Sequence, residues 1–201
     1  TASAGYVGGI VGNGKSTVQS CYVVGDVTNN RTTGLAGLAG GIMGADASGA
    51  KVKNSYVLGT VRGEGDAYAI AGPSVTLEGP SYCLEGDYTF AGDNAVFKTE
   101  EQFKNGHVAA LLGAAFGQEL GTDQHPVFNN GSNQIFEVDG AYVNATPETV
   151  DKLIAAIGSV GLEGSENCFA KVTLARQCYD ILSETDKLSV NNLSSLLAAE
   201  E

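Results

Sequence analysis

A short Gly-rich pattern recurs in the first half of this chain and limits what it can fold into. The pattern reads GGIVG at residues 8–12 with SCYVVGDV at 20–27, and then GGIMG at 40–44 with NSYVLGTV at 54–61. A weaker third copy reads AIAG at 69–72 and PSYCLEG at 80–86. The tyrosines Tyr22, Tyr56 and Tyr82 are 34 and then 26 positions apart. Spacing in this range is typical of stacked repeats that bury their apolar sides against one another.

Glycine supplies 28 of the 201 residues, which requires many tight turns and favours short strands over long helices. Hydrophobic residues make up 43% of the chain and charged residues 17%, so the chain is globular rather than disordered. Within each repeat, short apolar runs bounded by Gly, Asn and Asp predict strands. The variable stretches at residues 28–34 and 45–49 predict loops.

The motif GGIVG followed by SCYxxGxV resembles the GLUG repeat of bacterial surface and secreted proteins, over about residues 5–90. This resemblance implies a parallel β-helix-like stack, which is often attached to adhesins, peptidases and glycoside hydrolases. The third copy lacks the Gly-Gly pair, so a less regular third turn is expected.

The net charge of −12 limits the partners of the chain. An acidic surface repels phosphate backbones and anionic lipids, so neither nucleic acid nor a membrane surface is an expected partner. No apolar run reaches the roughly 18 residues that a membrane span needs. The first residues do not resemble a signal peptide. Because the chain opens inside a repeat, we interpret it as an excised part of a longer protein, with export signals and anchors outside it.

The sequence changes character over residues 98–139. Thr99 and Gln102 match a capping box, which marks the start of a helix. Apolar residues at helical spacing follow, and Gly113 predicts the helix end.

The segment at residues 116–128 is similar to one that often closes such repeat arrays. We expect residues 127–128 to pair with residues 135–136 as a hairpin, across a turn at residues 129–131. The helix and this hairpin would together cover the apolar end of the stack.

From residue 146 to the end the pattern is helical. Thr146 and Pro147 are the expected N-cap and first position of a helix that ends before Gly158. Two further helices are predicted, at residues 163–182 and 184–199.

The stretch ARQCYDIL at residues 175–182, with KLxVxN at 187–192, resembles a small three-helix module of Gram-positive surface proteins. The resemblance covers about residues 146–200 and implies a spacer or domain-joining role without known chemistry. The apolar faces of the three helices can cover one another, so we expect residues 142–201 to fold without the repeats.

Residues 9–16 match the P-loop pattern GxxxxGK[ST] at every position, with Lys15 as its lysine. A P-loop needs a helix directly after this motif, because the helix N-terminus binds the phosphates. Here a strand-like run follows and ends at Gly25, and the second repeat has no lysine at the equivalent position. The repeat pattern therefore explains these glycines, and we predict no nucleotide site.

The two histidines do not indicate a metal or catalytic site. His107 lies on the apolar side of the predicted helix, so we interpret it as a packed side chain. His125 precedes a proline in an expected turn. Neither has a Cys or carboxylate at ligand spacing. The chain contains no GxSxG or HExxH motif that would place a nucleophile or a zinc ion.

The four cysteines are not spaced for zinc binding or thioredoxin-type chemistry. Cys168 and Cys178 lie ten positions apart on one predicted helix, roughly 15 Å, which is too far for a disulfide. A disulfide between Cys21 and Cys83 and a pair of buried free thiols both remain open.

Two further patterns suggest ligands. Asp26, Asp46, Asp66 and Asp87 recur about every twenty residues, as calcium ligands do in some β repeats, but they occupy different places in the repeat. We therefore interpret them as solvated turn residues. The equivalent residues Tyr22, Tyr56 and Tyr82 predict a ladder of rings, which would bind sugars if exposed and pack if buried. We favour packing, because the chain contains no Trp.

The predicted fold class is a mainly β N-terminal part, a short parallel β-helix or solenoid of Gly-rich repeats with a capping helix and hairpin, followed by a small all-α three-helix module. The predicted domains are residues 1–97 for the repeats, 98–139 for the cap and 146–201 for the module.

The predicted function is that of a non-catalytic structural or adhesive region, which extends or presents other domains of a secreted or cell-surface protein of a Gram-positive bacterium. The alternative is an ancillary, substrate-contacting region of a secreted glycoside hydrolase or peptidase. We identify no catalytic, cofactor-binding or metal-binding residue and expect no cofactor. The expected partners are a host or cell-surface glycan or protein, and the chain is expected to be a monomer joined to further domains.

Overall fold

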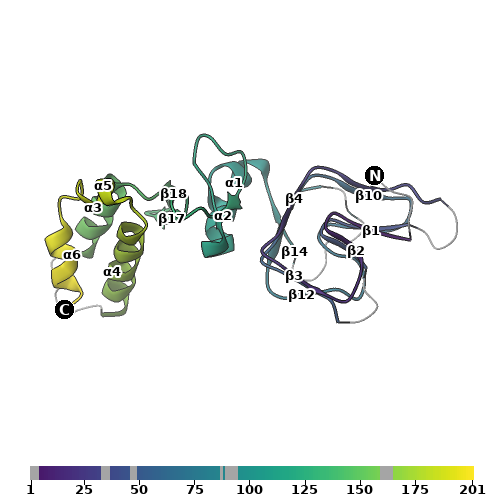
Figure 1. The fold of residues 1–201 in the computed structure, drawn as a ribbon, viewed down its shortest axis with the longest axis horizontal. Coiled ribbons are helices and arrows are strands. Elements are labelled where there is room, and N and C mark those ends of the chain that lie inside the picture. Colours follow the sequence, from purple (N-terminus) through teal and green to yellow (C-terminus); the bar gives the residue numbers. More distant parts are fainter. Residues whose placement is uncertain (1–4, 33–36, 46–48, 87, 89–94, 159–164) are drawn as a thin grey trace. The chain divides into compact units, whose positions relative to one another are not determined.

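The chain divides into two compact units in the computed structural model, which describes residues 5–32, 37–45, 49–86, 88, 95–158 and 165–201 (Figure 1). The first unit is Thr1–Gln102 and contains the repeats. The second unit is Phe103–Glu201 and contains helices and antiparallel strand pairs. The division into two units does not test the three predicted domains, which remain a prediction.

Strands in the first unit are short, because its apolar runs span only a few residues between Gly, Asn and Asp. Ser20 and Asn54, at equivalent positions of the first two repeats, have positive φ values of 50° and 45°. The strands are β1 (Tyr6–Gly8), β2 (Val11–Asn13), β3 (Thr17–Gln19), β4 (Tyr22–Val24), β5 (Val27–Asn29), β6 (Leu38–Gly40), β7 (Met43–Ala45), β8 (Lys51–Lys53), β9 (Tyr56–Leu58), β10 (Val61–Gly63), β11 (Ala67–Tyr68), β12 (Thr76–Leu77), β13 (Ser81–Leu84) and β14 (Ala95–Lys98).

Strands of successive repeats pair in parallel. Tyr56 of the second repeat pairs with Tyr22 on one side and with Tyr82 on the other. The same parallel pairing brings Val27 beside Val61. The strand orders of these small sheets are β1-β6-β11, β2-β7, β12-β8-β3, β14-β13-β9-β4 and β10-β5. Equivalent residues of the repeats therefore lie side by side, as the tyrosine spacing predicted.

Apolar side chains from all three repeats form the core of the first unit. Ile42, Met43, Val52, Val57 and Ile70 are fully buried in it. Met43, Val52 and Val57 lie in three different sheets, where successive side chains of a strand point to opposite faces, whereas Ile42 and Ile70 lie in the bends beside the strands. Burying a side chain of this size contributes roughly 1.5–3 kcal/mol.

Glycines allow the backbones of successive repeats to approach closely. A Cβ atom placed on Gly44 would lie 2.6 Å from the carbonyl oxygen of Gly12, and one on Gly72 would lie 1.8 Å from that of Gly44. A Cβ atom on Gly59 would lie 2.2 Å from the carbonyl oxygen of Gly25. Since these separations are shorter than real contacts allow, the register of the repeats requires glycine at these positions.

Polar side chains also link the repeats. The Asp26 carboxylate accepts hydrogen bonds from the backbone N–H and the hydroxyl of Thr60, at 3.0 and 2.6 Å. The buried Ser55 hydroxyl accepts a bond from the Cys21 N–H at 3.1 Å and donates one to the Lys53 carbonyl at 2.8 Å. The bonds of Ser55 satisfy a hydroxyl that stacking removes from water, whereas Asp26 and Thr60 form their link at the exposed surface.

From the end of the first unit onward, helical elements come first, two antiparallel strand pairs follow, and further helices complete the chain. The helical elements are α1 (Glu100–Lys104), which spans the boundary between the units, α2 (His107–Leu112), the 3₁₀ helix η1 (Gly113–Ala115), α3 (Pro147–Ile157), α4 (Ser165–Asp180), α5 (Glu184–Lys187) and α6 (Leu193–Ala199). The strands are β15 (Phe116–Gly117), β16 (Val127–Phe128), β17 (Ile135–Val138) and β18 (Ala141–Asn144).

The predicted helix starts at Thr99 and Thr146 are confirmed, whereas the start predicted at residue 163 lies outside the described residues. The Thr99 hydroxyl accepts a bond from the Gln102 N–H at 3.2 Å, and the Gln102 side chain accepts one from the Thr99 N–H at 3.0 Å. The Thr146 hydroxyl caps α3 in the same way, by accepting a bond from the Thr149 N–H at 3.1 Å. The predicted helix after Thr99 is broken, however, because Gly106 adopts a φ of 88° between α1 and α2.

The predicted hairpin between residues 127–128 and 135–136 is wrong. β16 pairs instead with β15, and β17 pairs with β18. The residues between β17 and β18 are Asp139 and Gly140, with φ values of 53° and 79°. Asp-Gly is a preferred two-residue hairpin turn, because both central positions need positive φ. This short turn brings β17 and β18 together in preference to the longer connection.

The predicted third helix at residues 184–199 is also wrong, because two short helices replace it. Between α5 and α6, the Asp151 carboxylate on α3 accepts bonds from the backbone N–H groups of Asn191 and Asn192, at 3.0 and 3.1 Å. These bonds hold residues 191–192 outside a helix.

The predicted fold class, a β-solenoid with a cap followed by an all-α module, is wrong. The chain is mixed α/β, and its strands lie in several small parallel and antiparallel sheets. In the second unit, Phe136 of β17 is 3% exposed and shares one core with Val150 and Leu196 of the helices. The short helices leave apolar surface that the hairpin β17–β18 covers. The fragment 142–201, which was expected to fold alone, therefore lacks part of this core.

The first prediction tests the close approach of the repeats. Gly72→Ala should lower the free energy of unfolding by about 1–3 kcal/mol or more, because the new methyl group would overlap the Gly44 carbonyl oxygen. Thermal unfolding followed by circular dichroism measures this loss. The matched control is Gly14→Ala, whose Cβ would meet Val11 at an ordinary 3.6 Å and should leave stability almost unchanged. Equal melting temperatures for both variants would contradict the requirement for glycine.

Candidate functional site

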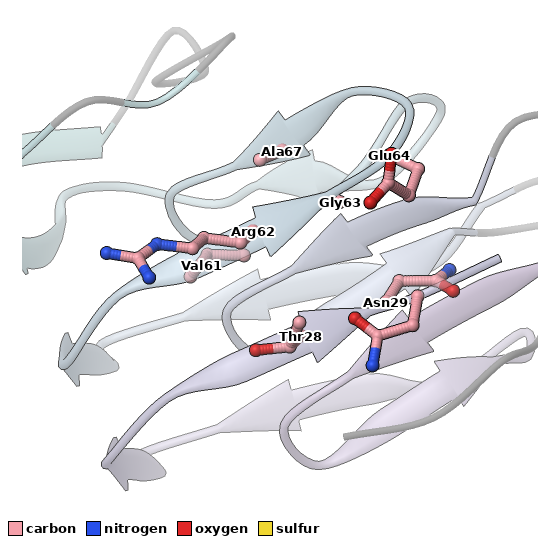
Figure 2. A pocket seen from close by; sticks show the side chains of 8 residues that line it. Thr28, Asn29, Val61, Arg62, Gly63, Glu64 and Ala67 are labelled. Carbon is pink, nitrogen blue, oxygen red and sulfur yellow. The ribbon is translucent and has the colours of Figure 1, made fainter. Parts of the chain in front are cut away.

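The candidate site is a pocket of about 440 Å³ beside the parallel pair β5–β10 in the first unit. Figure 2 shows the side chains around it. β5 and β10 place Thr28 next to Arg62 in the register of the pair. The residues that line the pocket are Thr28, Asn29, Asn30, Val61, Arg62, Gly63, Glu64 and Ala67.

Buried residues form the floor of the pocket. Val61 is 1% exposed and Asn29 is also 1% exposed. The Asn29 amide donates to the Leu38 carbonyl at 3.0 Å, and its oxygen accepts a bond from the Arg31 N–H at 3.1 Å. The Glu64 N–H donates to the Asn29 carbonyl at 3.3 Å. Asn29 therefore links the backbone at Arg31 and Leu38 to the backbone at Glu64 on the other strand of the pair.

Charged and polar side chains form the exposed rim. Arg62, Glu64 and Asn30 are exposed, and Thr28 is half-buried. The Arg62 side chain points away from that of Glu64, so a cation and an anion stand at separate places on the rim (Figure 2). A ligand at this pocket would meet the donors of a guanidinium and an amide together with the acceptors of a carboxylate.

The nearby Asp26 is part of the link between the repeats. Hydrogen bonds from the Thr60 hydroxyl and N–H lower the pKa of Asp26, and the positive charge of Arg62 adds to this effect. Asp26 therefore remains a carboxylate near neutral pH, where it keeps its bonds to Thr60. It is not among the residues that line the pocket.

The lining residues offer several hydrogen-bonding groups to a ligand. Thr28 supplies a hydroxyl, Asn30 an amide and Arg62 and Glu64 opposite charges. None of the lining residues is a Cys, His or Lys. These groups match a ligand rich in hydroxyl groups, which both donates and accepts hydrogen bonds. No sequence motif marks this pocket, because its residues come from the ends of two repeats and only strand pairing brings them together.

Residues 9–16, which match the P-loop pattern, lie in strand and loop structure. Lys15 is exposed in the connection between β2 and β3, so a strand follows the motif where a P-loop needs a helix. A Cβ atom on Gly49 would lie 3.7 Å from the Lys15 side chain. The motif thus lies beside the second repeat, as the repeat pattern predicted.

The two histidines lie in structural contacts. His107 is half-buried, and its Nδ1 lies 2.8 Å from the Tyr142 hydroxyl, with the two rings edge to face. Partial desolvation raises the pKa of Tyr142, and the charge of Glu137 adds to this effect. His125 Nδ1 lies 2.9 Å from the carbonyl oxygen of Pro126 in a bend.

Within the described part of the chain, no three His, Cys, Asp or Glu side chains form a group that could hold a metal ion. Of the four recurring aspartates, Asp26 accepts hydrogen bonds from Thr60 with its carboxylate. The backbone carbonyl of Asp66 accepts a hydrogen bond from the Ala39 N–H. Asp46 and Asp87 lie outside the described residues.

All four cysteines are free thiols. Cys83 and Cys178 are fully buried, and burial raises the pKa of each thiol to about 12. A thiol with such a pKa stays protonated near neutral pH, whereas a nucleophile must be a thiolate. These two cysteines therefore act as small apolar side chains in the cores of the two units.

The tyrosine ladder lies largely inside the first unit. Tyr56 is 0% and Tyr82 4% exposed, whereas Tyr22 in the first repeat is half-buried. The rings of Tyr22 and Tyr56 are stacked, with centroids 5.1 Å apart and planes 4° from parallel. The packing interpretation is confirmed for Tyr56 and Tyr82.

No family model, curated protein or solved structure matches this chain. The resemblance of residues 5–90 to GLUG repeats and of residues 146–200 to a three-helix module stays a prediction. Of the helices that the structure describes, none combines the length and the apolar character needed to cross a membrane.

The second prediction tests the tyrosine ladder. Tyr56→Ala should lower the free energy of unfolding by ~3–5 kcal/mol, because it removes a fully buried ring and its stacking on Tyr22. Urea unfolding measures the loss. Tyr56→Phe keeps the ring and serves as the control, which should retain most of the stability. If Tyr56→Ala stays as stable as the original chain but loses binding on a glycan array, the ladder binds ligand and does not serve packing.

Proposed function

We propose that this chain is a non-catalytic structural region of a secreted or cell-surface bacterial protein, where it extends or presents other domains. The resemblance of its repeats to the GLUG pattern suggests this class, and the resemblance of residues 146–200 to a three-helix module suggests the Gram-positive source. The expected partners are further domains of the same protein and a glycan or protein outside the cell.

The observation that supports this role is the use of polar side chains between the repeats. Asp26 bonds to Thr60, and Ser55 bonds to Cys21 and Lys53. Asn54 donates to the Ser20 hydroxyl at 3.3 Å across the same interface. These side chains hold one repeat to the next, which is what a region that must keep its shape under load requires.

The buried groups of the first unit support the same role. Tyr56 and Tyr82 pack inside the repeats, and the Cys83 thiol is kept neutral by burial. The two tyrosine rings and the cysteine thiol, which could otherwise bind a ligand or react, are therefore part of the packed interior.

The third prediction tests the structural role in a single-molecule force experiment on the full chain, held by its two ends. Under a low constant force the original chain should keep its length until it unfolds in discrete steps. Gly72→Ala should unfold sooner at the same force, because its repeats cannot approach closely. Gly14→Ala should behave like the original chain.

A substrate screen completes this test. The purified chain should release no product from polysaccharides or peptides. Turnover that disappears on substitution of a pocket residue would contradict the non-catalytic role. Gradual lengthening of the original chain at the lowest forces would contradict the structural role.

The pocket beside β5–β10 favours a second function, the ancillary contact of a secreted hydrolase with its substrate. The rim combines Arg62, Glu64 and Asn30 with the half-buried Thr28. Such a set of donors and acceptors can bind the hydroxyl groups of a glycan without transforming it.

The fourth prediction tests this second function. Arg62→Ala should weaken glycan binding by about tenfold or more, since a hydrogen bond to a charged group contributes roughly 1.5–3 kcal/mol. Binding on a glycan array, followed by calorimetry with the best glycan, measures the change. Lys15→Ala removes an exposed cation outside the pocket and should have no effect. An equal loss of glycan affinity in both variants would indicate attraction by charge alone. A failure of the original chain to bind any glycan would contradict the substrate-contacting role.

A further inference from the structure

The strands of the first repeat all lie at the ends of their sheets. β1, β2, β3, β4 and β5 each pair on one side with a strand of the second repeat, and each is the terminal strand of its sheet among the described residues. The second repeat, in contrast, has neighbours on both sides in three of the five sheets. We call the outer edge of β1–β5 the first-repeat edge.

Apolar residues at the first-repeat edge are exposed where their equivalents in the second repeat are buried. Ile10 is 45% exposed, whereas Ile42, which occupies the same place in the GGI motif, is 0% exposed. Ile42 lies between two repeats, since its carbonyl accepts a bond from the Ile10 N–H of the first repeat at 2.9 Å and its N–H donates to the Ile70 carbonyl of the third at 2.6 Å. Ile10 has the following repeat as a neighbour through its bond to Ile42, but among the described residues it has no preceding repeat. Val24 is 51% exposed, whereas its register partner Leu58 is half-buried. The difference therefore comes from the neighbouring repeat and not from the residue type.

The glycines at the first-repeat edge indicate what would cover it. The Cβ position of Gly44 points at the Gly12 carbonyl and that of Gly72 at the Gly44 carbonyl, so each faces the preceding repeat. At Gly12 itself, the nearest described atom is the Tyr6 carbonyl oxygen at 3.3 Å. Gly12 is thus the equivalent of Gly44 and Gly72. If another repeat preceded the first one, its backbone would require glycine at this position, and glycine is present.

Gly25, in the connection between β4 and β5, has neighbours on one side only. A Cβ on Gly59 would lie 2.2 Å from the Gly25 carbonyl oxygen, whereas a Cβ on Gly25, whose φ of 117° already favours glycine, would meet no described atom within 4 Å. Among the described residues, the place that the first repeat occupies beside Gly59 is therefore empty beside Gly25.

We infer that the first-repeat edge is an interface for one more repeat of the same pattern, which pairs with β1–β5 in the parallel register that the second repeat shows. The established interface between the first two repeats is its template, because it buries Ile42 and fits backbone against Gly44 and Gly59. The occupant is polypeptide that contains the GGI and SYVxGxV motifs, linked to this chain on its N-terminal side.

A second copy of this chain is a poorer occupant. Two identical edges that meet about a twofold axis would pair their strands antiparallel. Antiparallel pairing does not place carbonyl oxygens against Gly12 and Gly25 in the way that the parallel register places them against Gly44 and Gly59. The inference does not depend on the proposed function, since an enzyme-associated region could equally contain further repeats.

The experiment compares the full chain with the same chain extended before Thr1 by a copy of residues 37–66. Hydrogen exchange of the backbone amides in β2 and β4 is the readout. The extension should slow their exchange by at least about tenfold, because a paired edge opens less often. A second extension with the same residues in scrambled order is the control and should leave the exchange unchanged.

Gly12→Ala distinguishes the predicted register from mere contact. In the original chain it should lower the melting temperature much less than Gly44→Ala does, since the Cβ of Gly12 would lie 3.3 Å from the nearest described oxygen and that of Gly44 only 2.6 Å. In the extended chain it should abolish the added protection, because the same methyl group would collide with the new backbone as Gly44→Ala would with Gly12.

Three results would overturn the inference. The extension could give no more protection than the scrambled control. Gly12→Ala could leave the added protection intact, which would exclude the parallel register. Sedimentation of the original chain could show a dimer whose β2 and β4 amides are already protected, which would make a second copy the occupant.

Discussion

Close contact between the backbones of successive repeats, at Gly12, Gly44 and Gly72, is the constraint on which the first unit depends. A side chain at Gly44 or Gly72 would overlap a carbonyl oxygen of the preceding repeat, so the strands pair only because glycine stands there. Once the register is set, Tyr22 stacks on Tyr56 and the Asp26 carboxylate reaches Thr60. The buried ring and the polar links are therefore consequences of the backbone contact.

The same register determines where a ligand could bind. It removes Tyr56 and Tyr82 from the surface and uses Asp26 and Ser55 as links between repeats. The pocket beside β5–β10 is lined by residues of this strand pair and by residues that follow its two strands. Function in such a chain is thus expected at the ends of strands, while the repeats themselves provide the rigid support.

The second unit shows how short helices depend on a hairpin. Phe136 of β17 shares one core with residues of α3, α4 and α6, and Asp151 fixes the bend before α6 through the backbone of residues 191–192. Helix starts at Thr99 and Thr146 were predictable, because a capping side chain and its partner lie within three residues of one another. The bend before α6 was not, since Asp151 lies 40 positions from Asn191.

The sequence by itself determined the local features: the strand-sized apolar runs, the capped helix starts and the equivalence of Tyr22 with Tyr56. Each depends on residues close together in the chain or on a visible repeat. Only the tertiary structure decided which strands pair, that the hairpin turns at Asp139-Gly140, and that Arg62 and Thr28 face one pocket. These depend on competition between distant contacts, in which the packing of a whole core outweighs the preference of any short segment.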